Sequence, residues 1–416
     1  MEIAERFINY TKFDTQSVDE SETVPSNPKQ LIFARYLKEE LEKEGLKEVE
    51  MDEKGYIYAT LPANTDKSVP TIGFIAHYDT ALDASGANIK ARIVKSYDGG
   101  DIELSPGIVS SPKMFPELLA HKGEDLIVTD GTTLLGADDK TGCTILVTLI
   151  ETILNDKKLK HGDLYFVFSQ NEDIGRAADY FQEEYVCGQP DIVIDVDGND
   201  PTAFSVENFT AAARTYRFHG KNAHPGNGFY TKYGDALTAA SYFIGQLPPE
   251  THPSASKDKE GYIHCYSVSH PTDEMGNEIT EDYLVKVRLR YFDAQDGDTF
   301  RQLLDEATEL TAKAFPNVMI DADPEVMQYE NVAYSMYPGL SDLIIQAAEK
   351  EGVKLTPRSE RGGTTAAMLA AKGQKGGPRL YSGQQAEHSV YEWTCAEDMY
   401  QMVMVARSII ETVAKQ

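Results

Sequence analysis

Two kinds of apolar pattern alternate along the first half of the chain. Apolar side chains recur at helical spacing in residues 3–10, 31–41 and 139–154, and form short continuous runs in residues 56–61, 71–76, 126–129, 164–168 and 192–196. Such runs are typical of buried strands. Strands that alternate with helices predict an α/β sheet, interrupted by a loop-rich excursion over residues 85–122.

The pattern changes after about residue 208. Strand-like, helical, strand-like, strand-like, helical and strand-like segments follow one another in residues 211–218, 235–247, 262–268, 283–292, 299–315 and 318–321. This β-α-β-β-α-β order is typical of a ferredoxin-like module. From about residue 327 the α/β pattern resumes, with helices at 341–351, 364–371 and 395–413 and a strand at 378–381. We therefore predict a discontinuous α/β domain, residues 1–208 and 327–416, interrupted by an inserted α+β domain, residues 209–326.

Polar residues end the apolar run at residues 71–76. His77 and Asp79 come directly after it. Residues two apart on a strand share a face, so both side chains can point the same way. An imidazole that binds a metal is commonly oriented by a carboxylate of this kind.

Four later segments also carry carboxylate or histidine side chains near the end or start of a predicted element. These side chains are Asp138 and Asp139, Glu172 and Asp173, Asp195 and Asp197, and His388. Histidine and carboxylate donors without thiolates fit catalytic zinc, or another divalent ion such as cobalt or manganese. The set predicts a two-metal hydrolase.

Individual roles can be assigned to some of these carboxylates. Asp139 sits where a loop enters a helix and is expected to bridge two ions, whereas Asp138 is expected to cap the helix. Glu172 and Asp173 face different ways, so one can bind metal while the other acts as a general base. Asp195 and Asp197 share a strand face, and spacing alone leaves open which of them is the ligand.

Composition narrows the class of protein. A chain of 416 residues is expected to form two domains, and its net charge of -28 argues against nucleic acid and anionic membranes as partners. Neither a targeting segment nor a membrane-spanning run is evident in the sequence, so a cytoplasmic location is expected. Cys143, Cys187, Cys265 and Cys395 are scattered, as expected of reduced, buried thiols.

Several motifs together resemble the zinc-dependent exopeptidase family that includes aminotripeptidases and aminoacylases. They lie at residues 14–15, 25–26, 73–80, 97–100, 132–140, 196–198, 207–209, 224–226 and 361–364, so the resemblance covers nearly the whole chain. The tracts from Gly73 and around Asp139 are the most specific. The resemblance implies a zinc-peptidase α/β domain with a ferredoxin-like lid that also forms a homodimer.

The resemblance also implies a role for each site residue. His77 and Asp197 would hold one zinc ion, Asp173 and His388 the other, with Asp139 bridging, Glu172 as general base and Asp79 orienting His77. His224 in the lid would stabilise the oxyanion. Arg290, with Arg288 as a rival on the same face, and Arg361 would clamp the peptide's carboxylate, and Gly362 and Gly363 would lead into a helix whose free N–H groups favour an anion.

The implied activity is removal of the N-terminal residue from tripeptides by a metal-dependent aminopeptidase. Two departures bear on it: Asn171-Glu172-Asp173 stands where the family has Asp-Glu-Glu, and Thr365 stands where it has a carboxylate. The shorter Asp173 can still bind metal. Loss of the carboxylate at Thr365 keeps open an alternative, an amidohydrolase acting on N-acyl amino acids or dipeptides.

Overall fold

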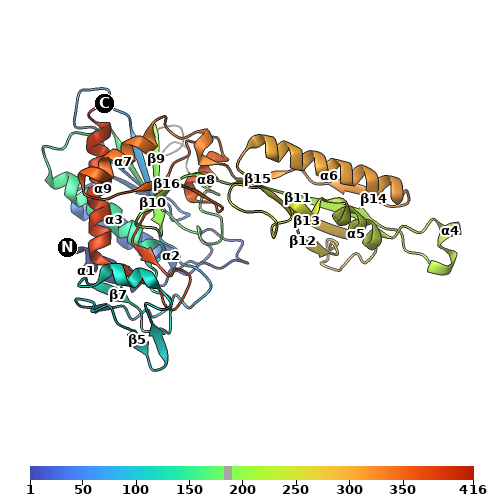
Figure 1. Ribbon diagram of the computed structural model, residues 1–416, viewed down its shortest axis with the longest axis horizontal. Helices are drawn as coiled ribbons and strands as arrows, with labels where there is room; N and C mark the ends of the chain where they lie inside the picture. Colours follow the sequence, from blue (N-terminus) through green and yellow to red (C-terminus); the bar gives the residue numbers. More distant parts are fainter. Residues whose placement is uncertain (182–189) are drawn as a thin grey trace. The chain divides into compact units, whose positions relative to one another are not determined.

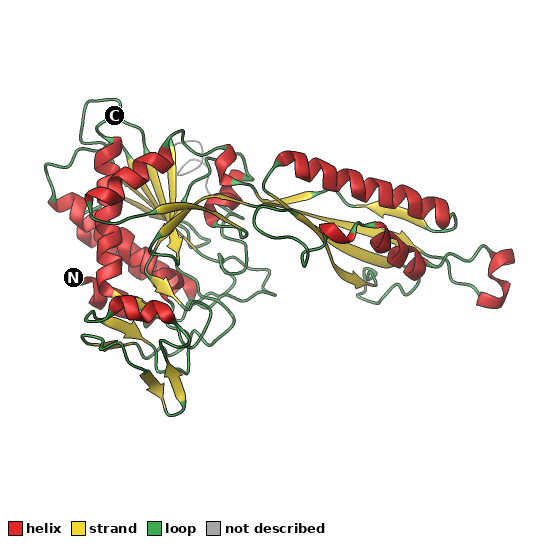
Figure 2. Ribbon diagram, in the orientation of Figure 1, coloured by secondary structure: helices red, strands yellow, loops and turns green. Residues whose placement is uncertain are grey.

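A computed structural model describes residues 1–181 and 190–416. The chain divides into two compact units (Figure 1): unit 1 comprises residues 1–206, 332–358 and 364–416, and unit 2 comprises residues 207–331 and 359–363. Unit 1 is α/β and unit 2 is α+β (Figure 2), so the predicted fold class is confirmed.

Unit 1 is built on a sheet that has eight strands among the described residues. In spatial order these are β1 (Glu48–Met51), β2 (Ile57–Leu61), β8 (Leu164–Ser169), β3 (Ile72–His77), β9 (Ile192–Gly198), β17 (Arg379–Tyr381), β10 (Ala203–Asn208) and β16 (Thr356–Glu360). The four central strands, β8, β3, β9 and β17, are mutually parallel. Their carboxyl ends therefore meet at one edge of the sheet, where ligand sites of open α/β sheets form.

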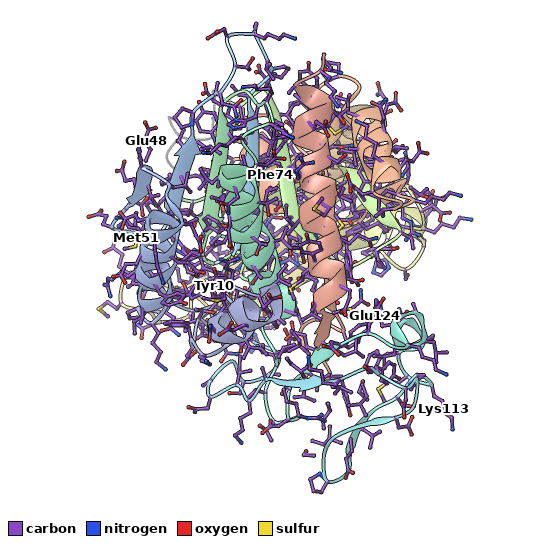
Figure 3. The ribbon with its side chains drawn as sticks, turned by 90° about the vertical axis from the view of Figure 1, so that its left-hand side faces the viewer. Tyr10, Glu48, Met51, Phe74, Lys113 and Glu124 are labelled. Atoms are coloured by element: carbon purple, nitrogen blue, oxygen red, sulfur yellow. The ribbon has the colours of Figure 1, made fainter. Side chains whose placement is uncertain are left out.

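Helices cover this sheet and complete the core of unit 1. They are α1 (Ile3–Thr11), α2 (Gln30–Glu44), α3 (Ala137–Asn155), α7 (Leu340–Lys350), α8 (Thr365–Ala370) and α9 (Ala396–Val413). Helix α3 packs on β3 and β9, and α9 packs on α3 and α7 (Figure 3). Gly45 ends α2 in a left-handed conformation, φ 114°, which glycine adopts without steric cost.

The excursion predicted to be loop-rich contains short strands. Residues 92–121 form β4 (Arg92–Val94), β5 (Ile102–Ser105), β6 (Ile108–Ser110) and the 3-10 helix η1 (Pro116–His121). A small sheet orders β18 (Gln384–Gln385), β19 (Trp393–Cys395), β7 (Leu126–Val128) and β4. Trp393 is buried in the separate hydrophobic cluster under this sheet, so segments 90–128 and 384–395 are held together.

Unit 2 has its own sheet and its own hydrophobic core. Strands β12 (Tyr262–Ser269), β13 (Tyr283–Tyr291), β11 (Thr210–His219) and β14 (Met319–Ala322) lie in that order, and β15 (Val326–Tyr329) also pairs with β11. Helices α5 (Ala236–Gln246) and α6 (Ala294–Ala314) pack on the sheet, and α4 (Gly228–Thr231) is a single turn. Helix α6 begins earlier than predicted, because the Asp293 carboxylate accepts the Gln295 N–H and caps it.

Three of the four cysteines fall within the described residues. Cys143 and Cys395 are buried, Cys265 is half-buried, and none of these three forms a disulfide; Cys187 lies outside the described residues. Among the described residues, no helix combines the length and apolar content needed to cross a bilayer.

Candidate metal centre

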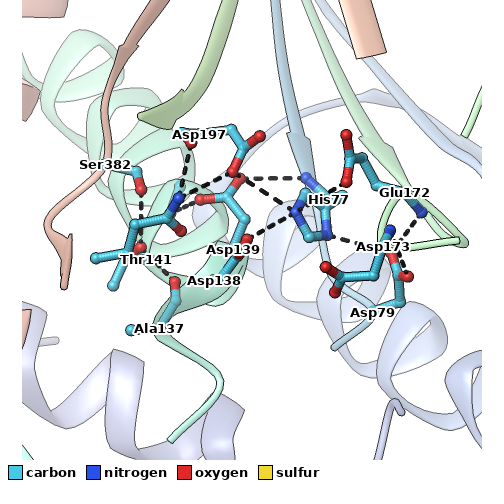
Figure 4. A network of polar contacts seen from close by, with 12 residues as sticks. His77, Asp79, Ala137, Asp138, Asp139, Thr141, Glu172, Asp173, Asp197 and Ser382 are labelled. Carbon is cyan, nitrogen blue, oxygen red and sulfur yellow. Dashed lines mark hydrogen bonds and ion pairs between the residues drawn. The ribbon is translucent and has the colours of Figure 1, made fainter. Parts of the chain in front are cut away.

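The ends of three parallel strands bring the candidate ligands together. His77 is the last residue of β3, Glu172 and Asp173 follow the end of β8, and Asp197 is the next-to-last residue of β9. His77 pairs with Ser169 across β3 and β8, so both strands end at the same level. Figure 4 shows these side chains pointing toward one another.

One donor cluster contains His77, Asp138 and Asp197. The Nε2 atom of His77 lies 3.0 Å from Oδ1 of Asp138 and 3.6 Å from Oδ1 of Asp197. One donor atom from each residue lies within 4.8 Å of the others, and all three residues are buried. Such spacing suits a single ion with one nitrogen and two oxygen ligands.

A second donor cluster contains Asp138, Asp173 and His388. The Nε2 atom of His388 lies 3.2 Å from Oδ2 of Asp138 and 3.1 Å from Oδ1 of Asp173. Asp138 therefore belongs to both clusters and turns one oxygen toward each histidine. A carboxylate shared in this way is what a pair of neighbouring ions requires.

The sequence predicts that Asp139 bridges two ions and that Asp138 caps the helix, whereas the structure places Asp138, and not Asp139, in both donor clusters. The Asp139 carboxylate accepts the backbone N–H groups of His77 at 3.3 Å and Gly142 at 3.1 Å. Burial, reinforced by the charge of Asp197, raises the pKa of Asp139. Burial also opposes ionisation of Asp138, but hydrogen bonds with His388 and His77 hold its pKa well below the usual range. Of these two neighbouring carboxylates, Asp138 is therefore the one that contacts both histidines of the centre.

Asp79 forms hydrogen bonds with the His77 ring and with the backbone of the segment that carries Glu172 and Asp173. Its Oδ1 atom lies 3.2 Å from Nδ1 of His77, and its carboxylate accepts the backbone N–H groups of Glu172 at 3.0 Å and Asp173 at 3.3 Å. The Ser17 hydroxyl donates a further hydrogen bond at 2.6 Å. Asp79 therefore fixes the His77 ring and the segment that carries Glu172 and Asp173.

Glu172 lies beside the first cluster. Its Oε2 atom is 4.0 Å from Nε2 of His77, and its side chain is 15% exposed. Burial raises the pKa of Glu172, with the negative charges of Asp197 and Asp173 adding to the effect. A raised carboxylate pKa brings the group closer to the range in which it exchanges protons near neutral pH.

The donor set fits divalent ions on electrostatic grounds. Burial and the nearby Asp138 raise the pKa of Asp173 to about 7, and hydrogen bonds with Asp138 and Asp173 raise the pKa of His388 to about 11. The second oxygen of Asp173 is buried without a hydrogen-bond partner. Several carboxylates thus face one another in a buried space, and cations would relieve their repulsion.

Three further residues support the centre and were not anticipated from the sequence. The Glu392 carboxylate is buried and accepts the backbone N–H groups of Leu135, Gly136 and Asp138 at 2.5, 2.7 and 3.0 Å. Arg379 Nε lies 3.3 Å from Oδ2 of Asp197, and Gln384 Nε2 donates to its Oδ1 at 3.2 Å. Glu392 and His388 share the loop between β18 and β19, so this loop also holds the segment that presents Asp138. The one signal in the sequence that could have pointed to Glu392 is its place four residues after the candidate ligand His388.

The predicted substrate residues His224, Arg290 and Arg361 all belong to unit 2, although Arg361 lies outside the predicted insertion, residues 209–326. His224 is exposed, and its Nδ1 atom accepts the Gly226 N–H. Arg290 is buried, donates to Leu289 O and Gln328 Oε1, and lies over the ring of Tyr329. Its rival Arg288 lies over Tyr266. Arg361 is exposed, donates to Asp258 O and Ser256 Oγ, and lies over the ring of Phe209.

Gly362 and Gly363, the predicted anion site, come shortly before helix α8, which spans six residues, Thr365–Ala370. Two N–H groups of its first turn are bound within the protein: Ala366 N–H to the Asp195 carboxylate and Ala367 N–H to the Thr364 hydroxyl. The same contact directs Asp195 toward α8, whereas Asp197 joins the donor cluster with His77.

Comparisons with known proteins agree on one family. The family model for Peptidase family M20/M25/M40 matches residues 129–412. Peptidase T of Clostridium acetobutylicum is 36% identical over 420 residues, an alignment that covers 100% of this chain and 100% of the relative. Peptidase T of Desulfitobacterium hafniense strain Y51 is 38% identical, over 100% of this chain and 98% of the relative.

Solved structures show the same fold. Aminopeptidase PepT from Bacillus cereus has a TM-score of 0.74 at 23% identity, covering 99% of this chain and 98% of that chain. The Bacillus subtilis YXEP protein, described as a dinuclear metal binding peptidase from M20 family, has a TM-score of 0.66 at 14% identity, covering 100% and 99%. The resemblance carried by the sequence motifs is therefore confirmed: the chain is a peptidase that belongs to family M20/M25/M40.

Proposed function

We propose that this peptidase removes the N-terminal residue from tripeptides and depends on two zinc ions, for which cobalt or manganese could substitute. The observation that carries the proposal is the pair of donor clusters that share Asp138, with Glu172 beside them. Full-length relatives named Peptidase T support the substrate class, and the dinuclear description of the Bacillus subtilis protein supports two ions.

The proposed roles are those of metal ligands and of a general base. His77 and Asp197 would hold one ion, Asp173 and His388 the other, and Asp138 both. Ions bound there would polarise the peptide carbonyl and lower the pKa of water. Glu172 takes the proton from the attacking water and delivers it to the leaving amine, while Asp79 keeps the His77 ring in its orientation.

Recognition of both peptide ends would explain a preference for tripeptides. A guanidinium has five N–H donors, and the hydrogen bonds of Arg290 to Leu289 O and Gln328 Oε1 leave others for a carboxylate. The exposed Arg361 and His224 are the further candidates in unit 2, for the carboxylate and the oxyanion respectively.

Unit 2 is also proposed to mediate a homodimer in the cytoplasm. Phe229 and Tyr230, next to His224, are 91% and 85% exposed, which is unusual for aromatic side chains unless another surface covers them. Light scattering should give the mass of a dimer for the purified protein. A Phe229→Ser, Tyr230→Ser variant should be monomeric, and an unchanged mass would contradict this interface.

The test of the proposed function is turnover of one tripeptide in three forms by the zinc-loaded protein. We expect cleavage of the free peptide with release of its first residue, and little cleavage of the N-acetylated or C-terminally amidated forms. Preference for the acetylated form would instead support the amidohydrolase alternative, with buried Thr365 as the first position to examine.

A further inference from the structure

A second set of metal-binding side chains lies outside the centre described above. It consists of His121, Glu124, Cys395 and Asp398, here called the His121 cluster, and one donor atom from each lies within 4.8 Å of the others. His121 ends η1, and Cys395 ends β19 directly before α9. Glu124 is labelled in Figure 3 beside the end of α9 at which that helix begins. The cluster shares no residue with the catalytic donor clusters found among residues 1–181 and 190–416.

The donor atoms are close and mostly shielded from solvent. Nδ1 of His121 lies 2.8 Å from Oε2 of Glu124, and its Nε2 lies 3.8 Å from Oδ2 of Asp398. Cys395 is 0% exposed and His121 6%, whereas the Glu124 side chain is 37% exposed. The cluster is therefore built into the fold yet can be reached from solvent through Glu124.

The Cys395 thiol has more carboxylate neighbours than it can serve as a hydrogen-bond donor. Sγ of Cys395 lies 3.2 Å from Oε2 of Glu124 and 3.2 Å from Oε2 of Glu397. A thiol has one proton and can donate to only one of the two carboxylates. The other sulfur–oxygen contact therefore lacks a proton, in a place where Asp398 adds a further carboxylate.

We propose that the His121 cluster binds a structural zinc ion, distinct from the catalytic ions. One imidazole, one thiolate and two carboxylates make a four-ligand set of the kind that zinc accepts. Burial raises the pKa of the Cys395 thiol. Binding breaks the S–H bond, the sulfur donates its lone pair to zinc, and the proton leaves to solvent.

The position of the cluster suggests what the ion would stabilise. Cys395 ends β19, and the loop that connects β18 to β19 carries both His388 and Glu392. The Tyr381 hydroxyl donates to Oδ2 of Asp398 at 2.7 Å and accepts from Gln385 of β18 at 3.3 Å. An ion at the cluster would thus fix the base of the hairpin that delivers a catalytic ligand.

Cobalt substitution separates this site from the catalytic centre. A thiolate bound to Co²⁺ gives a sulfur-to-metal charge-transfer absorption in the near ultraviolet, and the catalytic donor clusters contain no sulfur among the described residues. We expect the full-length protein to bind three Co²⁺ ions per chain and to show this absorption. Two ions per chain without a charge-transfer absorption would overturn the proposal.

Variants locate the absorption on one cysteine. Cys395→Ser should lose one ion and the absorption, whereas Cys265→Ser and Cys187→Ser should keep both. If Cys395→Ser does not fold, Glu124→Gln tests the same site through its most exposed ligand and should also lose the third ion. An absorption that persists in Cys395→Ser, or three ions retained in Glu124→Gln, would contradict the assignment.

Discussion

Asp138 and Asp139 are neighbours in the chain, but their carboxylates have different surroundings. Asp138 meets the imidazoles of His77 and His388, whereas Asp139 accepts backbone N–H groups of His77 and Gly142. Both side chains are buried, so exposure does not distinguish them. What distinguishes them is the partner of each oxygen, and on this ground we propose an ion-binding role for Asp138 and a structural role for Asp139.

The two positions predict different outcomes for the same substitution. Asp138→Asn should lower ion occupancy and reduce kcat/KM by more than about 100-fold, beyond the range usual for residues outside the ligand shell. Asp139→Asn should retain both catalytic ions and lose about 10-fold or less, because an amide oxygen still accepts N–H groups. Mass spectrometry of metal content and steady-state kinetics would measure both. The reverse order of losses would restore Asp139 as the bridge.

Glu172 is expected to act in proton transfer rather than in ion binding. Glu172→Gln should lower kcat by about 10²–10⁴-fold, because the amide cannot accept the proton, while ion content stays unchanged. Glu53→Gln, at a side chain that is 86% exposed, is the matched control and should behave as the unmodified protein. A near-normal kcat for Glu172→Gln would remove Glu172 from the mechanism.

Sequence patterns explain the meeting of candidate ligands where secondary structure fixes the direction of a side chain. His77, Asp173 and Asp197 end or follow buried strands, and period-2 spacing together with parallel pairing explains why they meet. No such rule governs the first residues of α3, whose Asp138 and Asp139 have non-helical backbone angles. Glu392 could not be assigned for a related reason, since its partners lie more than 250 residues earlier in the chain.

Among the elements, the buried strands were predicted well and the exposed or very short ones were not. β3 and β9 are mostly apolar, and all of their residues are buried. β16 is Thr-Pro-Arg-Ser-Glu at the sheet edge and mostly exposed, so it has no apolar pattern to recognise. β18 has only two residues and is defined by pairing with β19. A buried strand requires apolar side chains and is therefore recognisable in the sequence, whereas pairing at a sheet edge uses backbone hydrogen bonds and requires no such pattern.

One ion-pair network joins three helices of unit 1. Arg6 of α1 is 0% exposed and lies 2.9 Å from carboxylate oxygens of Glu40 and Glu44 in α2 and of Glu151 in α3. Its Nη1 also donates to the Thr148 hydroxyl at 2.7 Å. A single guanidinium thus satisfies groups on two other helices, of which Glu40 is itself buried.

Removal of this guanidinium should destabilise unit 1. Arg6→Ala leaves Glu40 buried without its cation, a change that typically costs about 3–5 kcal/mol. Arg35→Ala, an exposed position on α2, is the control and should change the free energy of unfolding by less than about 0.5 kcal/mol. Chemical denaturation followed by tryptophan fluorescence reports on unit 1, because Trp393 is the single tryptophan. Equal stability of the two variants would show that the network contributes little.

Across the whole molecule, each unit has its own hydrophobic core, and the candidate ion ligands accompany one of the two. The core of unit 1 surrounds α3, α9 and the parallel strands that end at the metal centre, and the core of unit 2 lies between its sheet and helices α5 and α6. All candidate ion ligands, catalytic and structural, belong to unit 1. Bound ions should therefore stabilise one unit directly and not the other.

Metal removal should accordingly separate the two units in a thermal scan. Ions present at about 100 to 1,000 times their dissociation constant stabilise the folded state by about 2.7–4.1 kcal/mol each, and chelation withdraws this contribution from unit 1 alone. We expect calorimetry of the ion-loaded protein to change on chelation by a downward shift of one transition, the one that tryptophan fluorescence also reports. The second transition should keep its midpoint. Shifts of equal size in both transitions would mean that the units unfold together, and the absence of any shift would mean that the donor clusters do not hold ions.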